Sequence, residues 1–487
     1  MTDSLIVAQL PLWPAGLLPP EKPVKSGLLH TGWLHPEQLP PCVTGSPTVM
    51  RCLDLLGPLP WQDFPERDLQ PHWTYPATPY AACAAAMLIK LNEGLPSMPR
   101  LHTFLGEHPG FIPLLGFPLV PAPNDPLGFN ALASLPTPQH LTALLHDLPQ
   151  AAGQFLLDHS VQLILAELAR RHLPPIDCVS LDTKHILAWV KENNHKTYVA
   201  DRYDKTKQPV GDPDCRLGCK RRHNLGAPQT PARDSVPARS LQVGEYYWGY
   251  GSGVVVAKIP GLGEFVLAEL TQPFDQSDVT YFFPLLFTAE QRLGYRPRVG
   301  TFDAAFDAWY VYAYFYREND PSAFAAVPFA QKGGMLYRAF APDGLPLCPA
   351  GLPMPLKGTF TDRTRGLFPH ERGQYVCPLR FPERSASRCP VHHKRWTRGG
   401  CTATMPTSIG ARLRYTLNRD GGAYKDAYRQ RTAVERINSQ AVTLGIERPH
   451  LRNGAAIANQ NTLIYTLINL RFLQRLHQTD QGDQDEA

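Results

Sequence analysis

The stretch "YRPRVGTFDAAFD" (residues 295–307) predicts a short β-strand that ends at Asp303 and is followed by a helix. Upstream, "IDCVSLD" (residues 176–182) predicts another strand, which ends at Asp182. Between them, "GSGVVVAKI" and "GEFVLAEL" flank "PGLG" and predict a β-hairpin. "DVTYFFPLLFTAEQRLG" then predicts a helix with Asp278 as its N-cap. Together these segments predict an α/β fold with helices packed against one sheet.

The predicted order is strand, hairpin, helix, strand, helix, strand, insertion and helix, which matches a ribonuclease H-like mixed sheet core. The chain is expected to divide into a Pro-rich N-terminal segment (1–72), a helical N-terminal domain that is one candidate for DNA binding (73–175), the first part of the core (176–329), a basic Cys/Arg-rich insertion (330–420), C-terminal helices that complete the core (421–477) and an acidic tail (478–487).

Composition places the chain among folded proteins. It has 487 residues, of which 43% are hydrophobic and 19% charged, so a real core is expected. Asp3 and several prolines make the N-terminus a poor signal peptide. No apolar run approaches the ~20 residues that span a bilayer. We therefore expect a cytoplasmic protein without a membrane segment, whose ten cysteines are buried or metal-bound rather than disulfide-paired.

Three acidic residues occur where such a core would bring them together. Asp182 and Asp303 are expected at strand ends, and Glu435 on the helix after the insertion; strand ends of this kind converge at one rim. Three adjacent carboxylates repel one another unless a cation is present. Magnesium or manganese suits oxygen ligands, and two such ions about 3.5–4 Å apart support phosphoryl transfer. Two rivals are set aside by position, since Asp177 starts its strand and Asp307 is expected to cap the next helix.

The segment "AYRQRTAVERIN" (residues 427–438) is expected to lie in one long helix. Its Tyr428, Arg431 and Glu435 are spaced by three and four, so a helix aligns them on one face. One interpretation is an exposed Arg–Glu pair worth a few tenths of a kcal/mol. The other is that Glu435 binds metal while Arg431 and Tyr428 grip DNA phosphate.

Three segments resemble, in order, those that carry the Asp, Asp and Glu of DDE transposases of bacterial insertion sequences. They are "SLDTKHILAWVK" (180–191), "GTFDAAFDAWYVY" (300–312) and "YRQRTAVERIN" (428–438), the last with the pattern Tyr-x-x-Arg-x-x-x-Glu. The similarity covers roughly residues 80 to 477 and belongs to the branch with an insertion before the final Glu. One position departs from the fuller family signature, because Val442 stands where that signature has a Lys.

This resemblance implies a DNA transposase that cuts at terminal repeats with metal-activated water and joins the freed 3′-hydroxyl to target DNA. It implies Mg²⁺ or Mn²⁺ as cofactor, DNA as partner and at least a dimer during synapsis. Because Val442 replaces that Lys, the resemblance leaves open how the transposon ends are held and whether a hairpin intermediate forms. Two alternatives remain: a ribonuclease H-like nuclease that cuts without joining, and a domesticated, inactive DNA-binding protein.

The insertion carries Cys348, Cys377, Cys389 and Cys401, each near Gly or Pro as in zinc knuckles. Four thiolates form a closed structural zinc site, in which His392 or His393 could replace one cysteine. The alternative is a set of unpaired buried cysteines. Upstream, Cys215, Cys219 and His223 lack an apparent fourth ligand and are interpreted as incidental.

Charge is concentrated in the insertion. Residues 357–398 hold ten Lys or Arg and three acidic residues. The net charge of this segment, +7, therefore exceeds the net charge of +5 of the whole chain. Such a segment is expected to face DNA, unless it is only a solvated surface. Lys220, Arg221 and Arg222 form a second, smaller patch expected to bind DNA. The nearby Tyr246, Tyr247 and Trp248 are expected to pack in the sheet rather than to stack on bases.

Overall fold

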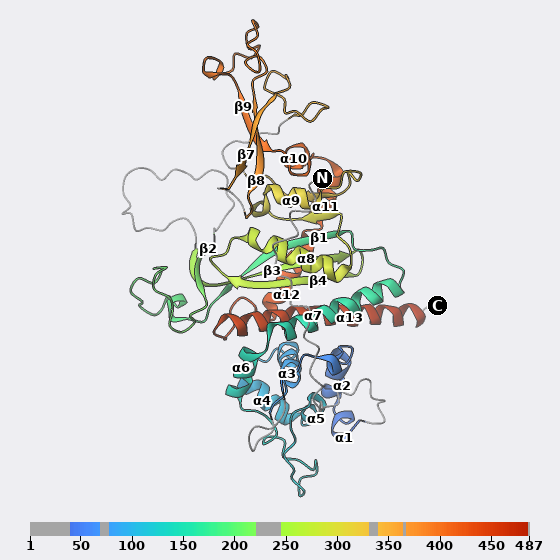
Figure 1. Cartoon of the computed structure of the whole chain (residues 1–487). Helices are drawn as coiled ribbons and strands as arrows, with labels where there is room; N and C mark the ends of the chain where they lie inside the picture. Colours follow the sequence, from blue (N-terminus) through green and yellow to red (C-terminus); the bar gives the residue numbers. More distant parts are fainter. Residues whose placement is uncertain (1–38, 69–76, 221–244, 331–338, 364–366, 486–487) are drawn as a thin grey trace.

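A computed structural model of the chain describes residues 39–68, 77–220, 245–330, 339–363 and 367–485. It confirms an α/β fold, with one mixed six-stranded sheet at the centre of the molecule (Figure 1). The N-terminal helices lie on one side of this sheet, and a smaller three-stranded sheet projects on the other. No helix in these described ranges is both long and apolar enough to cross a membrane.

The central sheet is built around β1. The strands are β1 (Cys178–Leu187), β2 (Arg216–Lys220), β3 (Glu245–Ile259), β4 (Gly263–Pro273), β5 (Val299–Thr301) and β6 (Phe324–Ala326). β3 pairs antiparallel with β1, and β2 and β4 pair antiparallel with successive parts of its other edge. β5 and β6 continue the sheet parallel to β1. The β3–β4 hairpin was predicted from the sequence, and the structure confirms it.

Successive side chains of β3 point to opposite sides of the sheet, and both sides are buried. Val254 and Val256 join a core shared with the N-terminal helices, α12 and most of α13. Val255 and Ala257 point to a second core that contains α8 and α9. Because neighbouring strand residues face opposite sides, a run of small β-branched residues suits a strand covered on both faces.

The helices of the described residues are α1 (Pro41–Thr44), α2 (Pro47–Leu56), α3 (Tyr80–Asn92), α4 (Met98–Glu107), α5 (Phe111–Leu115), α6 (Pro138–Asp147), α7 (Gln150–Arg170), α8 (Phe282–Leu293), α9 (Trp309–Phe315), α10 (Ile409–Thr416), α11 (Gly422–Arg429), α12 (Thr432–Thr443) and α13 (Gly454–Asp485). Short 3₁₀ turns are η3 (Trp61–Asp63), η4 (Lys191–Asn193), η5 (Asp278–Tyr281), η6 (Ala304–Phe306) and η7 (Trp396–Arg398).

Part of the Pro-rich segment is helical. α1 and α2 both begin with proline, which is favoured at the first helical position because its missing N–H would be unpaired there. The Ser46 side chain accepts from the Val49 N–H to cap α2. The buried Trp61 donates its ring N–H to the Leu56 carbonyl at 2.8 Å, which fixes the end of that helix.

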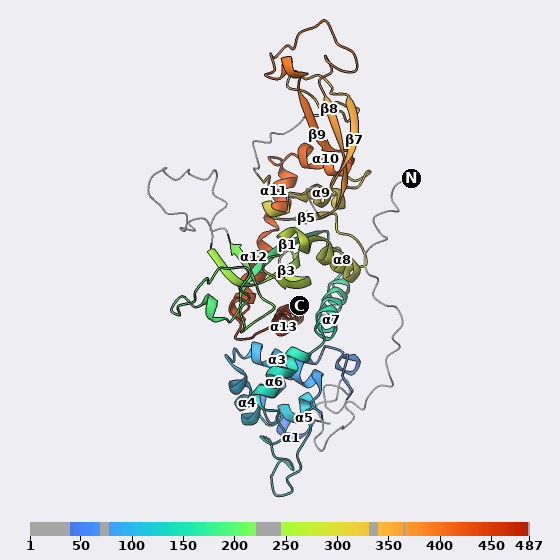
Figure 2. The same ribbon diagram turned by 60° about the vertical axis from the view of Figure 1, so that its left-hand side comes forward.

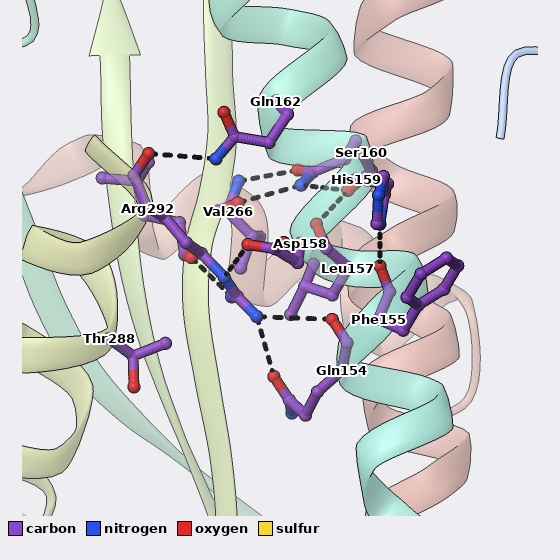
Figure 3. A network of polar contacts seen from close by, with 12 residues as sticks. Gln154, Phe155, Leu157, Asp158, His159, Ser160, Gln162, Val266, Thr288 and Arg292 are labelled. Carbon is purple, nitrogen blue, oxygen red and sulfur yellow. Dashed lines mark hydrogen bonds and ion pairs between the residues drawn. The ribbon is translucent and has the colours of Figure 1, made fainter. Parts of the chain in front are cut away.

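Two long helices, α7 and α13, run side by side between the sheet and the N-terminal helices (Figures 1 and 2). On α13, the Asn469 amide exchanges hydrogen bonds with the backbone of Val266 in β4 at 2.8 and 2.9 Å and also donates to Ser160 of α7. From α8, the Arg292 guanidinium donates to Asp158 and Gln154 of α7 and to the Leu267 carbonyl (Figure 3). These polar contacts fix both helices on the sheet.

The insertion forms its own small sheet from β7 (Leu356–Asp362), β8 (His370–Val376) and β9 (Thr402–Pro406). Its separate core includes Met354, Tyr375, Met405 and Tyr415, the last of these on α10. The sheet projects away from the centre of the molecule (Figure 1). The chain then returns through α10 and α11 to α12, which packs on β1, β3 and β4.

Candidate active site

Asp182 lies in the middle of β1, not at the strand end that was expected. The prediction ended the strand where the apolar run ends, but residues 183–187 continue to pair with residues 249–253 of β3. Backbone pairing tolerates polar side chains wherever one face of the strand is only partly covered. The Asp182 side chain therefore projects from a fixed central strand and is 18% exposed.

Asp303 follows β5, the strand next to β1. Ser180 on β1 and Thr301 on β5 are register partners, and their hydroxyl oxygens lie 2.7 Å apart. Two residues beyond Thr301, the Asp303 carboxylate accepts the Ala305 N–H at 2.8 Å and caps η6. The parallel pairing of β1 and β5 thus brings the two aspartates to neighbouring positions.

The predicted long helix around Glu435 is two helices. α11 ends at Arg429 and α12 begins at Thr432, so Gln430 and Arg431 form a junction between them. The Ser180 hydroxyl donates to the Gln430 carbonyl at 3.2 Å, which ties this junction to β1. A contact between residues so distant in sequence cannot be read from helical periodicity.

Arg431 lies between Asp182 and Glu435 and contacts both carboxylates. One of its terminal nitrogens donates to Asp182 Oδ2 at 3.2 Å, and the other forms an ion pair with Glu435. The Glu435 side chain is 56% exposed, whereas those of Arg431 and Asp182 are each 18% exposed. The pair predicted along the helix is therefore present, but its arginine also reaches the central strand.

The sequence analysis missed Asp278 as a member of this set. It was predicted to cap a helix, but Ser277 is the cap and Asp278 is the first residue of η5. The Thr183 hydroxyl donates to Asp278 Oδ1 at 2.8 Å, and the Asp278 charge raises the pKa of both Asp303 and Asp182, so this carboxylate lies near the other two. Opposite Thr183 is Gly253, where a Cβ would lie 2.4 Å from Cδ1 of Tyr281, so only glycine lets η5 approach this closely. No local signal in the sequence marks this contact.

Burial and mutual repulsion shift the titration of these aspartates. The pKa of Asp182 is raised to about 6, mainly by burial; the charges of Asp303 and Asp278 contribute to the rise, while Arg431 opposes it. Burial is also the main cause of a raised pKa at Asp303, where the Asp278 charge adds to it and the Ala305 N–H and Arg431 oppose it. The pKa of Asp278 is raised by burial as well. Desolvated, mutually repelling carboxylates are the environment in which a bound cation is most stabilising.

Two buried polar atoms at this site have no hydrogen-bond partner among the described residues. They are Oδ1 of Asn438 and Nε of Arg431. Nδ2 of Asn438 lies 3.4 Å from Asp182 Oδ2, so its free amide oxygen is held beside that carboxylate. An amide oxygen can bind a hard cation, and a guanidinium N–H can bind a phosphate oxygen. The donor set thus fits a divalent cation next to a phosphate, and Asn438 is a second residue that the sequence analysis missed.

The present arrangement of the acids is nevertheless not that of a closed metal site. Within the described residues, no three His, Cys, Asp or Glu side chains are grouped so that they could hold a metal ion. In this arrangement Asp182 is paired with Arg431 and Asn438. Glu435 reaches the other acids only through Arg431.

Neither rival aspartate belongs to the set. Asp177 forms an ion pair with Arg298 at the start of β1. Asp307 does not cap α9 as predicted, because Ala308 is the cap residue and the Asp307 carboxylate is buried against Arg414. It also accepts the Ala330 N–H at 3.0 Å. The Asp307 carboxylate, which the local sequence predicts to cap a helix, thus forms a buried ion pair instead.

Tyr428 lies on α11 and stacks on Tyr424, with ring centres 5.8 Å apart and planes 6° apart. Burial raises its pKa, and the charges of Asp303, Glu435 and Asp182 add to this while Arg431 opposes it, so its hydroxyl is close to the acidic set. Val442 lies on the last turn of α12 and is 37% exposed.

Three of the four insertion cysteines pack together. Cys348, Cys377 and Cys401 belong to one cluster, and the β8–β9 register, in which Val376 pairs with Thr402, places Cys377 opposite Cys401. Burial, together with the neighbouring Cys377 and Cys348, raises the pKa of Cys401 to about 12. Cys389 is also buried but lies outside this cluster, and His392 is exposed.

The upstream cysteines are separated by the fold. Cys215 is buried and lies 3.2 Å from the Asp212 carbonyl oxygen, while Cys219 is exposed on β2. Lys220 ends β2, and its side chain, Arg221, Arg222 and His223 lie outside the described residues. The prediction that the neighbouring aromatics pack in the sheet is confirmed, because Tyr247 and Trp248 are buried and Tyr247 stacks on Phe274.

Most cations of the basic insertion are free to meet a partner. Lys357, Arg363, Arg384, Arg388, Lys394, Arg395 and Arg398 are exposed, while Arg365 lies outside the described residues. Arg372 pairs with Asp362 at 2.9 Å, and Arg380 stacks over the Trp396 ring at 4.0 Å. Two cations thus stabilise the small sheet, and the exposed ones give it a basic surface.

No protein-family model matches this chain, and no significant match to it is found among curated proteins.

Proposed function

We propose that the protein is a DNA transposase of the DDE type, which cleaves strands at the terminal repeats of its element and joins them to target DNA. One observation carries this proposal. Arg431 links Glu435 to Asp182 beside Asp303 and Asp278, so acids that are far apart in the sequence meet at the central strand. Such clusters of perturbed carboxylates are typical of functional sites.

The strand arrangement supports a ribonuclease H-like core for this proposal. Neighbouring strands follow the order β4-β3-β1-β5-β6, with the first pairs antiparallel and β5 and β6 parallel to β1. α8 lies between β4 and β5 in the chain, and α9 between β5 and β6. The insertion then separates β6 from α12, as the resemblance to this transposase branch requires.

Asp182, Asp303 and Glu435 would hold Mg²⁺ or Mn²⁺, with the Asn438 amide oxygen as an additional donor. When bound, the cations neutralise phosphate charge and lower the pKa of the attacking water. The chain's own residues provide the positioning. The fixed β1 and β5 set the two aspartates, and the Ser180–Gln430 bond sets the start of α12.

Arg431 has two roles in this proposal. Without DNA it neutralises Asp182 and Glu435; with DNA its free Nε–H and fork geometry suit a phosphate oxygen. Tyr428, one turn earlier, would contact the same strand, and the exposed cations of the insertion would bind the backbone of the duplex. Joining two element ends implies a homodimer in the synaptic complex, acting on DNA in the cytoplasm.

The cysteine cluster would serve as a structural zinc site in the insertion. Cys348, Cys377 and Cys401 supply three candidate thiolates that would have to draw closer together, and Cys389 or His393 would have to move to supply a fourth ligand. Zinc content measured on protein purified without chelator tests this directly. About one zinc per chain, lost in Cys401→Ser, supports the site; no zinc in the wild type would leave a thiol cluster only.

The experiment that tests the function is cleavage and joining on a labelled duplex that carries the inverted repeats flanking the gene. Wild type and Glu435→Gln are compared with Mg²⁺, with Mn²⁺ and with chelator. Joined product from the wild type alone supports the transposase, whereas cutting without joining favours the nuclease. Binding without cutting by either protein favours the inactive DNA-binding protein, and equal cutting by both excludes Glu435 from the site.

A further inference from the structure

A second site lies where the N-terminal helices meet the central fold. It is a pocket of about 550 Å³, far from the insertion. Trp189, just after β1, forms one wall together with His450 and Arg452 from the loop before α13. Gln139 and Thr142 of α6 also line the pocket.

Trp189 is an exposed aromatic on a fixed backbone. On either side of it, the Ala188 N–H donates to the Trp248 carbonyl and the Val190 N–H to the Ala188 carbonyl, both at 3.0 Å. The Asn193 amide holds the Ala188 carbonyl at 2.7 Å. Despite these anchors the Trp189 side chain is 51% exposed. A large ring held this firmly, yet left open to solvent beside a pocket, is suited to stack on a ligand.

The rest of the wall is aromatic and cationic. The Arg452 guanidinium lies 5.0 Å from the centre of the Trp189 ring, and the His450 ring centre lies 5.4 Å from it. Their loop is well anchored, since the Glu447 carbonyl accepts the Leu187 N–H at 2.9 Å and Leu451 is buried. The pocket is therefore preformed and does not depend on a ligand to assemble it.

We propose that this pocket binds an unpaired nucleotide, with its base stacked on Trp189 and its phosphate paired with Arg452. The volume lies within the roughly 300–1,000 Å³ typical of small-ligand sites. An indole beside a guanidinium matches the two parts of a nucleotide, a flat base and an anion. The polar side chains of Gln139 and Thr142 are placed to meet base edges.

Two sources have this chemistry, a nucleotide within a DNA strand and a free nucleoside monophosphate. Trp189 follows Asp182 by seven residues along an extended chain, so the pocket lies about 20 Å from the acidic set. At that distance it would hold DNA away from the point of cleavage. This role in positioning rests on the proposed function, whereas nucleotide binding itself does not.

Binding is tested by fluorescence anisotropy of a short labelled single-stranded oligodeoxynucleotide, in the absence of divalent metal. Trp189→Ala is expected to weaken binding by about ten-fold, and Arg452→Gln also to weaken it, while Trp189→Phe keeps most of it. Tyr198→Ala is the matched control, because Tyr198 is 91% exposed and does not line the pocket. Equal affinity of Trp189→Ala and Tyr198→Ala would overturn the proposal.

Three further measurements sharpen this test. Thermal melting checks that each variant is folded. If a free deoxynucleoside monophosphate competes for binding, the free nucleotide is the ligand; if only single strands compete, the ligand is a nucleotide within DNA. If Trp189→Ala weakens binding of the matching duplex as much as binding of the single strand, the proposal of an unpaired base is refuted. If the wild type neither cleaves nor joins its repeat DNA but Trp189→Ala still weakens oligonucleotide binding, the pocket is supported and the transposase is refuted.

Discussion

Two arginines, the buried Arg292 and the partly buried Arg431, each link a helix to the central sheet, but their hydrogen bonding differs. All three guanidinium nitrogens of Arg292 donate, to Asp158, to the Leu267 carbonyl and to Gln154, and its side chain is 6% exposed (Figure 3). Arg431 uses its two terminal nitrogens, while its Nε is buried without a partner among the described residues.

The difference separates a structural network from a site. A saturated buried arginine fixes the elements around it and leaves nothing for a ligand. An arginine with a free donor, next to carboxylates whose pKa is raised by burial, is costly unless something else binds there. Arg292 thus stabilises the fold, whereas Arg431 belongs to the candidate site. Substitutions of the two arginines test this difference.

The largest expected effect is on cleavage by Arg431→Met. Loss of the phosphate contact and of the charge beside Asp182 is expected to lower the cleavage rate at least about a hundred-fold. Because Arg431 lowers the pKa of Asp182, its removal should also move the pH dependence of the residual activity to higher pH. Arg429→Met is the control, since the Arg429 side chain is 75% exposed. Similar rates for the two variants would contradict the role of Arg431.

Arg292→Met is expected to lower stability and to leave cleavage unchanged, in contrast to Arg431→Met. It leaves the buried Leu267 carbonyl without its donor, and an unsatisfied buried acceptor costs about 1–3 kcal/mol in the free energy of unfolding. Asp158 adds little to this cost, because its side chain is 43% exposed and water can solvate the carboxylate. Urea denaturation measures the loss, and cleavage per folded molecule should be unchanged. Arg170→Met removes an exposed arginine from Glu167, which keeps its ion pair with Arg171, and it should destabilise the protein less than Arg292→Met does. A small loss for Arg292→Met would refute the structural assignment.

The raised pKa of Asp182 predicts how cleavage depends on pH. A cation requires the ionised carboxylate, so activity in Mg²⁺ should fall about ten-fold per pH unit well below about 6 and level off above it. Binding of Mg²⁺ near pH 6 should release protons, which calorimetry in buffers of different ionisation enthalpy detects. Activity that is flat down to pH 5 would show that Asp182 is not protonated in the free enzyme.

The smallest expected effect concerns Glu269, which is buried behind the Arg292 network. Burial raises its pKa to about 7, although Thr462, Arg292 and Gln154 oppose the shift. The folded protein holds this proton more tightly than the unfolded chain, so the contribution of Glu269 to stability is fully present below about pH 4.5 and is lost as the pH rises through 7. Melting temperatures of Glu269→Gln should therefore decline less than those of the wild type across that interval. Parallel curves would contradict this.

Local pattern was sufficient for part of this molecule. The β3–β4 hairpin and the helix after it follow from apolar alternation around a glycine turn, and the structure contains both. The buried Tyr247 and Trp248 were also assigned correctly from their sheet context. Such features depend on neighbours within a few residues, which a sequence displays directly.

Other predictions failed because distant residues decided the outcome. Asp307 was assigned to a cap, but Arg414 pairs with it across the fold. The helix carrying Glu435 is interrupted where Ser180 holds the Gln430 carbonyl. Asp278 and Asn438 join the site through contacts with β1 that no sequence spacing marks.

By itself the sequence determined the α/β alternation, the three acids in order and the basic insertion, because residue type and periodicity carry that information locally. Only the tertiary structure decided that Arg431 stands between those acids, that Asp278 and Asn438 adjoin them, and that Trp189 opens into a pocket beside α6. The physical reason is that desolvation and pairing depend on which groups are brought together by strand pairing and helix packing, and these partners lie far apart along the chain.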